Sequence, residues 1–270
     1  MRFLLFIIIA GLLSSCSGIN KVLKSKDANY KLRMAEGYYV KKKYHFAQAL
    51  YEDVMPNFRG SPEFENIYYK YAYCAYYQQD YLNAENLFKS FLEAFPNSTK
   101  AEELDYMRAY CYYKMSPKVP LDQSNTVRAM GMLQTFINTH PNSARNKEAT
   151  DLIDICRYKL EEKERMAAQL YYDLGQFRAA GVAYTSLLNN FPDSQKGDEY
   201  KLMVIKSYFK FAEFSVDEKK IERFEQVITE CNDFVDRFPD SKLAKEVESY
   251  ISSSNNNIKK LNNEQTKTST

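Results

Sequence analysis

Four copies of a short proline motif divide this 270-residue chain at similar intervals. The copies are Phe95-Pro96-Asn97-Ser98, His140-Pro141-Asn142-Ser143, Phe191-Pro192-Asp193-Ser194 and Phe238-Pro239-Asp240-Ser241. Their prolines are 45, 51 and 47 residues apart. Because proline cannot continue a helix and Asn, Asp or Ser can cap the next one, each motif is predicted to end one helix and begin another. The spacing predicts a chain of repeated helix pairs.

Three of these prolines share a pattern upstream: a small residue lies twelve positions before each proline, and a large residue lies eight positions before it. The small residues are Ala84, Ala129 and Ala180, and the large ones are Phe88, Leu133 and Tyr184. This spacing resembles the second helix of the tetratricopeptide repeat. A further unit fits from Ala28. The resemblance implies an all-α superhelical solenoid of about five helical hairpins over residues 28–250, with extra residues in the turns at 116–123 and 215–220 and one long helix within 145–174.

Composition argues against several functional classes. There are 37 basic and 35 acidic residues, so no charge excess predicts nucleic-acid binding. The two histidines, His45 and His140, have no local metal-ligand pattern. The sequence also lacks a recognisable nucleophile motif, a phosphate-binding glycine loop and a paired-carboxylate site. We therefore expect neither an enzyme nor a metal or cofactor site. Stacked hairpins present an extended surface, so the expected function is binding.

The N-terminus has the features of a secretion signal. Met1-Arg2 is followed by an apolar run over residues 3–13, which is too short to span a bilayer core of about 30 Å. The run ends in Leu13-Ser14-Ser15-Cys16, which resembles a bacterial lipobox. Residues 1–15 are then a cleaved leader, and Cys16 carries covalent diacylglyceryl and N-acyl (palmitate-type) lipid. An ordinary signal peptide with a chance cysteine is the alternative.

The residues after the lipobox predict the location. Ser17 stands where aspartate would favour inner-membrane retention, and no acidic cluster follows. These features favour the periplasmic face of the outer membrane, with residues 16–27 as a lipidated linker. At the other end, residues 251–270 are rich in Ser, Asn, Lys and Thr and are expected to be a disordered tail.

Four cysteines follow Cys16 in the chain. They are Cys74, Cys111, Cys156 and Cys231, and none is in a CxxC motif. Although the expected compartment is oxidising, their positions in helical patterns favour small buried residues over disulfide pairs.

Taken over nearly its full length, the chain resembles the BamD family, the tetratricopeptide lipoproteins of the outer-membrane β-barrel assembly machinery, in the form found in Bacteroidetes-type bacteria. Besides the lipobox, the resemblance is carried by Val22-Leu23-Lys24-Ser25, Ala72-Tyr73-Cys74, Ala109-Tyr110-Cys111, Leu121-Asp122-Gln123, and residues 159–163 preceding Leu170-Tyr171-Tyr172. It implies a non-catalytic subunit that docks on the POTRA domains of the barrel protein BamA and receives unfolded outer-membrane proteins. Other assembly lipoproteins are further expected partners.

In tetratricopeptide arrays the first helix of each pair lines a concave groove. Aligning Ala35, Ala72 and Ala109 with the small residue of that helix places fifteen residues in the groove, eight of them tyrosines. The predicted substrate-peptide positions are Tyr39, Tyr69, Tyr73, Tyr76, Tyr77, Tyr106, Tyr110, Tyr113 and Lys114, with Asn29, Leu32, Glu36, Val40, Asn66 and Glu103 beside them. Tyrosine suits an extended peptide with alternating aromatic residues. The alternative is that many of these rings pack between helices.

For the BamA contact, the family pattern of C-terminal docking implies Tyr171, Tyr172, Gln176 and Arg178. Lys41-Lys42-Lys43 could attract a peptide carboxylate, although a solvated surface run is the more frequent meaning of such a cluster.

Two other functions fit a lipobox followed by helical repeats. One is glycan capture of the starch-utilisation type, although those proteins are much longer and commonly stack sugars on Trp, which is absent from this chain. The other is a general periplasmic scaffold for envelope complexes. Co-purification with BamA separates the assembly function from glycan capture.

Overall fold

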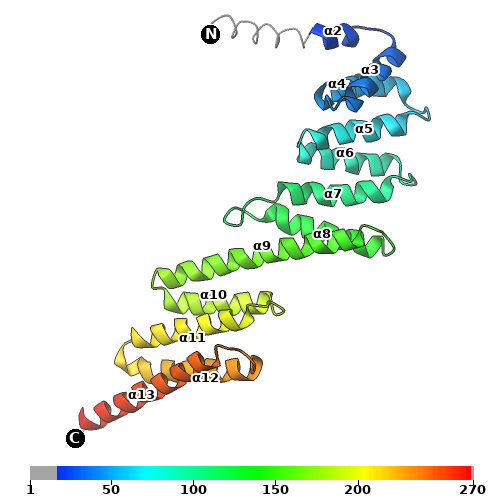
Figure 1. Ribbon diagram of the computed structural model, residues 1–270. Coiled ribbons are helices and arrows are strands. Elements are labelled where there is room, and N and C mark those ends of the chain that lie inside the picture. Colours follow the sequence, from blue (N-terminus) through cyan, green and yellow to red (C-terminus); the bar gives the residue numbers. More distant parts are fainter. Residues whose placement is uncertain (1–16, 269–270) are drawn as a thin grey trace, which may run out of the picture. The chain divides into compact units, whose positions relative to one another are not determined.

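The computed structural model describes residues 17–268, which are helical almost throughout (Figure 1). Within this range there are twelve α-helices, one 3-10 helix and no β-strand. The elements are α2 (Ser17–Leu23), α3 (Ala28–Val40), α4 (Tyr44–Val54), η1 (Met55–Phe58), α5 (Phe64–Tyr77), α6 (Tyr81–Ala94), α7 (Ala101–Met115), α8 (Ser124–Thr139), α9 (Asn146–Asp173), α10 (Phe177–Asn190), α11 (Gly197–Glu213), α12 (Asp217–Arg237) and α13 (Ala244–Thr268). The all-α fold class is confirmed.

The chain divides into two compact units, residues 1–157 and 158–270. In unit 1, α2 precedes the hairpins α3–α4, α5–α6 and α7–α8, and each hairpin packs on the next. In unit 2, the second part of α9 pairs with α10, followed by the hairpin α11–α12 and by α13. The structure thus has the expected five hairpins of a tetratricopeptide-type solenoid.

The proline motifs mark the boundaries between hairpins, as predicted. They lie between α6 and α7, α8 and α9, α10 and α11, and α12 and α13. The alanines that define the repeat, Ala84, Ala129 and Ala180, are fully buried, which lets neighbouring helices approach closely. The large residues of the same register, Phe88, Leu133 and Tyr184, are buried as well.

The serine of each motif links its hairpin to the preceding one. Its hydroxyl donates a hydrogen bond to an acidic side chain on the first helix of the previous hairpin, and it accepts one from the backbone N–H two residues later. The pairs are Ser98–Glu65 (2.8 Å), Ser143–Glu102 (2.5 Å), Ser194–Glu161 (2.6 Å) and Ser241–Asp198 (2.6 Å). We call these contacts the serine bridges. They connect neighbouring hairpins in both units.

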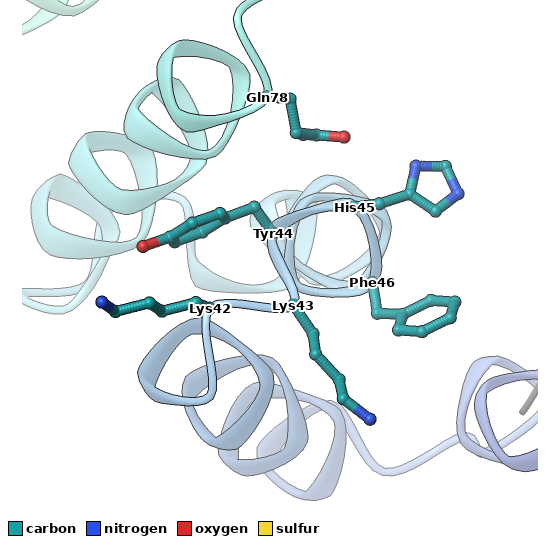
Figure 2. Close-up of a pocket in the computed structure, with 6 residues that line it drawn as sticks. All are labelled: Lys42, Lys43, Tyr44, His45, Phe46 and Gln78. Atoms are coloured by element: carbon teal, nitrogen blue, oxygen red, sulfur yellow. The ribbon is translucent and has the colours of Figure 1, made fainter.

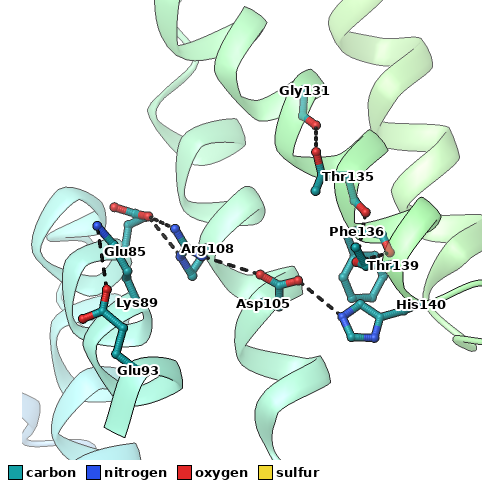
Figure 3. Close-up of polar contacts among 10 residues, drawn as sticks. All are labelled: Glu85, Lys89, Glu93, Asp105, Arg108, Gly131, Thr135, Phe136, Thr139 and His140. Carbon is teal, nitrogen blue, oxygen red and sulfur yellow. Dashed lines mark hydrogen bonds and ion pairs between the residues drawn. The ribbon is translucent and has the colours of Figure 1, made fainter. Parts of the chain in front are cut away.

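A row of polar and charged side chains connects α6, α7 and His140, the residue after α8, in unit 1 (Figure 3). Two guanidinium nitrogens of Arg108 donate to the buried carboxylate of Glu85, each at 3.1 Å. A third nitrogen lies 3.6 Å from Asp105, whose other oxygen is 3.3 Å from Nε2 of His140. Because Glu85 is buried, the arginine supplies the hydrogen bonds that its carboxylate needs there.

The structure confirms two of the predicted insertions in the repeat. Helix α9 is one continuous helix of 28 residues. The loop between α7 and α8 contains residues 116–123, and Gln123 stabilises it because its side-chain N–H group donates to the backbone carbonyls of Lys118, Val119 and Leu121.

Three segments differ from the sequence-based expectation. Helix α12 begins at Asp217, so most of 215–220 is helical rather than an extended turn. The expected tail, 251–270, is largely part of α13, because Val247, Tyr250 and Ile251 pack against α11 and α12. The expected linker, 16–27, contains α2, which packs on the first hairpin through Ile19 and Val22. The leader 1–15 and Cys16 lie outside the described residues.

Candidate protein-binding surfaces

A connected set of tyrosine rings extends over the three hairpins of unit 1. Neighbouring rings have centroids 4.5–6.4 Å apart, within the range of favourable aromatic contacts. We call this set the tyrosine cluster; it comprises Tyr39, Tyr44, Tyr69, Tyr73, Tyr76, Tyr77, Tyr81, Tyr106, Tyr110 and Tyr113. Its members come from α3, α4, α5, α6 and α7. The cluster therefore joins residues that are far apart in the sequence.

The rings of the cluster differ in their access to solvent. Tyr77 is 44% exposed, whereas Tyr73 and Tyr106 are only 6% and 1% exposed. Tyr73 and Tyr106 thus belong to the core, and the predicted groove must be corrected at these two positions. The half-buried positions are Tyr39, Tyr69, Tyr76, Tyr110 and Tyr113, and Lys114 is exposed. Some of the predicted tyrosines therefore reach the surface, and others pack between helices.

The sequence-based prediction did not include two tyrosines of the cluster. It considered only the first helix of each hairpin, whereas these two residues begin the second helices α4 and α6. Tyr44 stacks on Tyr77 with centroids 4.5 Å apart, and Tyr81 contacts Tyr76 at 5.7 Å. Phe177 occupies the same position at the start of α10. In three hairpins an aromatic residue comes directly after the turn between the two helices. This recurrence in the sequence could have predicted these positions.

Polar groups fix the buried side of the cluster. The hydroxyls of Tyr69 and Tyr73 both donate to the carboxylate of Glu103, at 3.1 and 2.6 Å. Burial raises the pKa of Tyr69 to about 12, with the nearby Glu103 charge as the next cause. Burial also raises the pKa of Tyr76 to about 12. Both phenols therefore stay protonated well above physiological pH, and Tyr69 donates to Glu103 in this form.

Cations lie against the rings at the edges of the cluster. Nζ of Lys114 is 5.9 Å from the ring centroid of Tyr81, and Nζ of Lys70 is 5.8 Å from that of Tyr39. Lys70 is also 2.5 Å from the carboxylate of Glu36. Lys114 is exposed in the last turn of α7, so it presents positive charge beside the aromatic surface.

The lysine run forms the turn between α3 and α4, where all three side chains are exposed. Lys42 has a left-handed backbone (φ 56°). A shallow cavity of about 340 Å³ lies beside this turn (Figure 2). Its lining residues are Lys42, Lys43, Tyr44, His45, Phe46 and Gln78. Tyr44 and Lys42 extend to one side in this view, and His45 and Phe46 to the other.

A second, more apolar surface lies in unit 2, where the α9–α10 turn meets the α11–α12 turn. Phe177 and Phe214 stack there with centroids 5.7 Å apart and planes at 11°, and Tyr172 contacts Phe177 at 5.3 Å. Phe214 is 74% exposed and Leu174 is 65% exposed. Three rings are in contact there, and large side chains of the same two turns are exposed beside them. We call these residues of the two turns together the turn patch; the rings are Tyr172, Phe177 and Phe214, and the exposed residues are Leu170, Tyr171, Leu174 and Val216.

The four predicted docking residues lie in or beside the turn patch. Tyr171 is 45% exposed, Tyr172 is half-buried, and Gln176 and Arg178 are exposed. Sequence reasoning missed Phe214, which follows α11 and is distant in the sequence. An exposed cluster of large apolar residues commonly marks a site of protein interaction.

The cysteines of the described part of the chain are free and buried. They are Cys74, Cys111, Cys156 and Cys231. Burial raises the pKa of Cys74, Cys111 and Cys231 to about 12. Their burial agrees with the favoured prediction that these cysteines are small buried residues.

Together, the hairpins define the class of this protein: it is an all-α, tetratricopeptide-type repeat protein. The sequence model of the YfiO family, described as outer-membrane lipoprotein, matches residues 24–212. Because the match covers more than half of the chain, the chain belongs to this family of outer-membrane lipoproteins. No helix among residues 17–268 is both long and apolar enough to cross a membrane.

Solved structures similar to this chain include other helical-repeat proteins. The TPR2AB domain of yeast Sti1, in a complex with pHSP90, is 11% identical with a TM-score of 0.39; the match covers 84% of this chain and 98% of that one. A TPR repeats protein from Bacteroides fragilis NCTC 9343 is 14% identical with a TM-score of 0.41, over 85% of this chain and 99% of that one. No curated protein matches the chain.

Proposed function

We propose that this protein is the BamD-type subunit of the outer-membrane β-barrel assembly machinery, in its Bacteroidetes-type form. In this role it binds unfolded barrel proteins in the periplasm and docks on the POTRA domains of BamA. Membership of the outer-membrane lipoprotein family supports this proposal. The observation that carries it is the tyrosine cluster, whose exposed edge offers aromatic contacts to an extended chain.

The chemistry of the cluster suits a barrel-protein segment. A β-strand of an outer-membrane barrel carries apolar and aromatic side chains at alternate positions, which face the lipid once it is inserted. Tyr44 and Tyr77 form a stacked pair that such an aromatic side chain can contact, and Lys114 adds a cation at the edge. Large rigid rings lose little side-chain entropy on binding, which favours recognition of many related peptides.

The turn patch is the proposed contact with BamA. It exposes Leu174 and Phe214, whose burial against a folded domain would be favourable. Tyr171, Tyr172, Gln176 and Arg178 supply aromatic and polar groups around these residues. Apolar anchors surrounded by polar groups are common in protein interfaces.

Cys16 is the proposed attachment point of the lipid. The four later cysteines are completely buried, so a lipid chain could not be attached to them without unfolding the repeats. The burial of these four thiols supports the cysteine of the predicted lipobox as the attachment point in a lipoprotein of this family. Two or three acyl chains there would give stable anchoring.

Substrate binding can be tested with a synthetic peptide that corresponds to the last strand of a barrel protein. We expect Tyr44→Ala with Tyr77→Ala to weaken binding about tenfold or more, because both rings lie at the accessible edge. The matched control is Tyr158→Ala, which removes an exposed tyrosine outside the cluster. Equal affinity of the double variant and the control would refute this site. Stabilisation by oligosaccharides without peptide binding would favour glycan capture.

Docking can be tested by co-purification with BamA. We expect Leu174→Glu with Phe214→Glu to abolish co-purification, since charged groups would have to be desolvated in the interface. Val235→Glu, at another exposed apolar position of unit 2, should leave co-purification intact. Circular dichroism checks that each variant is folded. Normal recovery of BamA with the folded double variant would exclude the turn patch as the docking site.

A further inference from the structure

The chain between Cys16 and the first repeat is folded onto that repeat. Helix α2 begins at Ser17, and its residues Ile19 and Val22 are 8% and 3% exposed. Both belong to the same buried cluster as Leu50 and Val54 of α4. The proposed lipid-bearing residue is therefore followed directly by a packed helix.

The connection from α2 to α3 is also fixed by hydrogen bonds. The N–H of Ser25 donates to the carbonyl of Val22 at 3.0 Å. Asp27 caps α3, since its carboxylate accepts the N–H of Tyr30 at 3.0 Å and its own N–H donates to the hydroxyl of Ser25. Residues 17–27 thus form a short, structured link in place of a flexible tether.

This link carries a local excess of positive charge. Lys21, Lys24 and Lys26 are all exposed, and residues 17–26 contain no acidic side chain. The whole chain has 37 basic and 35 acidic residues; without Arg2 and these three lysines, 33 basic residues remain against the same 35 acidic ones. The rest of the chain therefore has a net charge of −2, and the three lysines beside the proposed anchor bring the net charge of the mature protein to +1.

We propose that α2, with Lys21, Lys24 and Lys26, forms a basic foot that lies on the anionic phospholipid headgroups of the membrane that holds Cys16. This inference rests on the proposed lipid anchor. Lys21 is four residues beyond Ser17, about 6 Å along the helix, which is less than the screening length of about 8 Å at physiological salt. Lysines this close to an anionic surface are attracted to it.

The foot fixes the first hairpin at the membrane surface. Because α2 packs on α3 and α4, attraction of its lysines to the headgroups also restrains the orientation of that hairpin. The remaining chain has a net charge of −2, so it adds no overall attraction to an anionic surface. The lipid supplies the attachment, and the basic foot supplies the orientation.

The experiment uses the acylated mature protein in vesicles of phosphatidylethanolamine and phosphatidylglycerol. The chain has no Trp, so Asn20→Trp, at an exposed position of α2, provides a single fluorescent reporter. We expect a headgroup nitroxide quencher to reduce its emission strongly. About 1 M salt, which shortens the screening length to about 3 Å, should remove most of that quenching. Val40→Trp, at the other end of α3, should be quenched several-fold less.

Charge reversal tests the lysines themselves. In the Asn20→Trp protein, Lys21→Glu with Lys24→Glu and Lys26→Glu should lower quenching to the level seen in phosphatidylcholine vesicles. The matched control reverses the exposed run Lys41, Lys42 and Lys43, which changes the net charge equally and should leave quenching unchanged. Vesicle flotation reports the anchor separately: loss of flotation in the parent protein overturns the lipid site, whereas flotation with quenching insensitive to charge reversal overturns only the basic foot.

Discussion

Gly181 lies where α10 and α11 approach closely in unit 2. A Cβ atom at this position would be 2.9 Å from ring atoms of Tyr208, closer than a normal contact. The neighbouring Thr185 hydroxyl donates to the carbonyl of Gly181, so the backbone here is also held in place. The absent side chain is therefore part of how these helices pack.

The glycines allow a paired prediction. Gly181→Ala should lower the free energy of unfolding by about 1–3 kcal/mol, because the methyl group displaces the Tyr208 ring. Gly131→Ala should raise it by about 0.5–1 kcal/mol through helix propensity, because an added Cβ atom on this exposed side of α8 would meet open space. Urea unfolding measures both. Equal effects of the two substitutions would contradict the close packing of α10 on α11.

At the level of the helical hairpins, the serine bridges hold each hairpin against the one before it. Ser194 donates to Glu161 at 2.6 Å, and the hydroxyl of Tyr200 donates to the same carboxylate oxygen at 2.7 Å. The carboxylate thus receives two hydrogen bonds from the next hairpin. The local sequence pattern could suggest a helix cap at this serine, but not its partner on another hairpin.

Removal of one bridge should have a measurable effect on stability. Ser194→Ala should lower the free energy of unfolding by about 1 kcal/mol, because Glu161 loses one of its two donors in a partly buried position. Ser186→Ala, at an exposed position of α10, should change it by less than about 0.5 kcal/mol. Guanidinium unfolding of both variants makes the comparison. A loss for Ser186→Ala as large as for Ser194→Ala would refute the bridge.

The sequence predicted elements best where a single residue type dictates local geometry. Proline motifs located the ends of α6, α8, α10 and α12, and the uninterrupted stretch within 145–174 predicted α9. The helical segment after residue 250 was missed because its composition is polar, although Ile251 packs on neighbouring helices and Ser254 is fully buried. Tertiary contacts of a few apolar residues there outweigh the composition of the segment.

The candidate surfaces were only partly predictable for a similar reason. Repeat register places a tyrosine on a first helix, but it does not say how much of the ring the next hairpin covers. Tyr77 and Tyr106 are both predicted groove residues, yet one is 44% exposed and the other 1%. Tyr44 and Tyr81 were missed because they come from second helices.

At the scale of the whole molecule, the buried phenols of both units make stability sensitive to alkaline pH. Burial raises the pKa values of Tyr69, Tyr76 and Tyr184 to about 12, against about 10 in the unfolded chain. The folded state thus binds these protons more tightly, so their contribution is complete below pH 10 and is lost as the pH rises to 12. We expect a lower free energy of unfolding at about pH 11 than at about pH 9.

Urea unfolding at the two pH values, with phenolate absorbance recorded in parallel, checks this expectation. Tyr76→Phe should make the decrease smaller, since it removes one phenol that titrates differently in the folded and unfolded states. Unchanged stability, with tyrosines ionising in the folded protein near pH 10, would contradict the burial of the cluster.

The proposed function requires that a lipid-anchored repeat protein receives unfolded barrel proteins at the exposed edge of its tyrosine cluster. Photocrosslinking in living cells tests this directly, with a photoreactive residue at position 77 and, for comparison, one at position 235 on α12. We expect position 77 to crosslink to newly exported outer-membrane barrel proteins and position 235 not to do so. Crosslinks to barrel proteins at equal yield from both positions, or none from position 77, would exclude this role for the cluster.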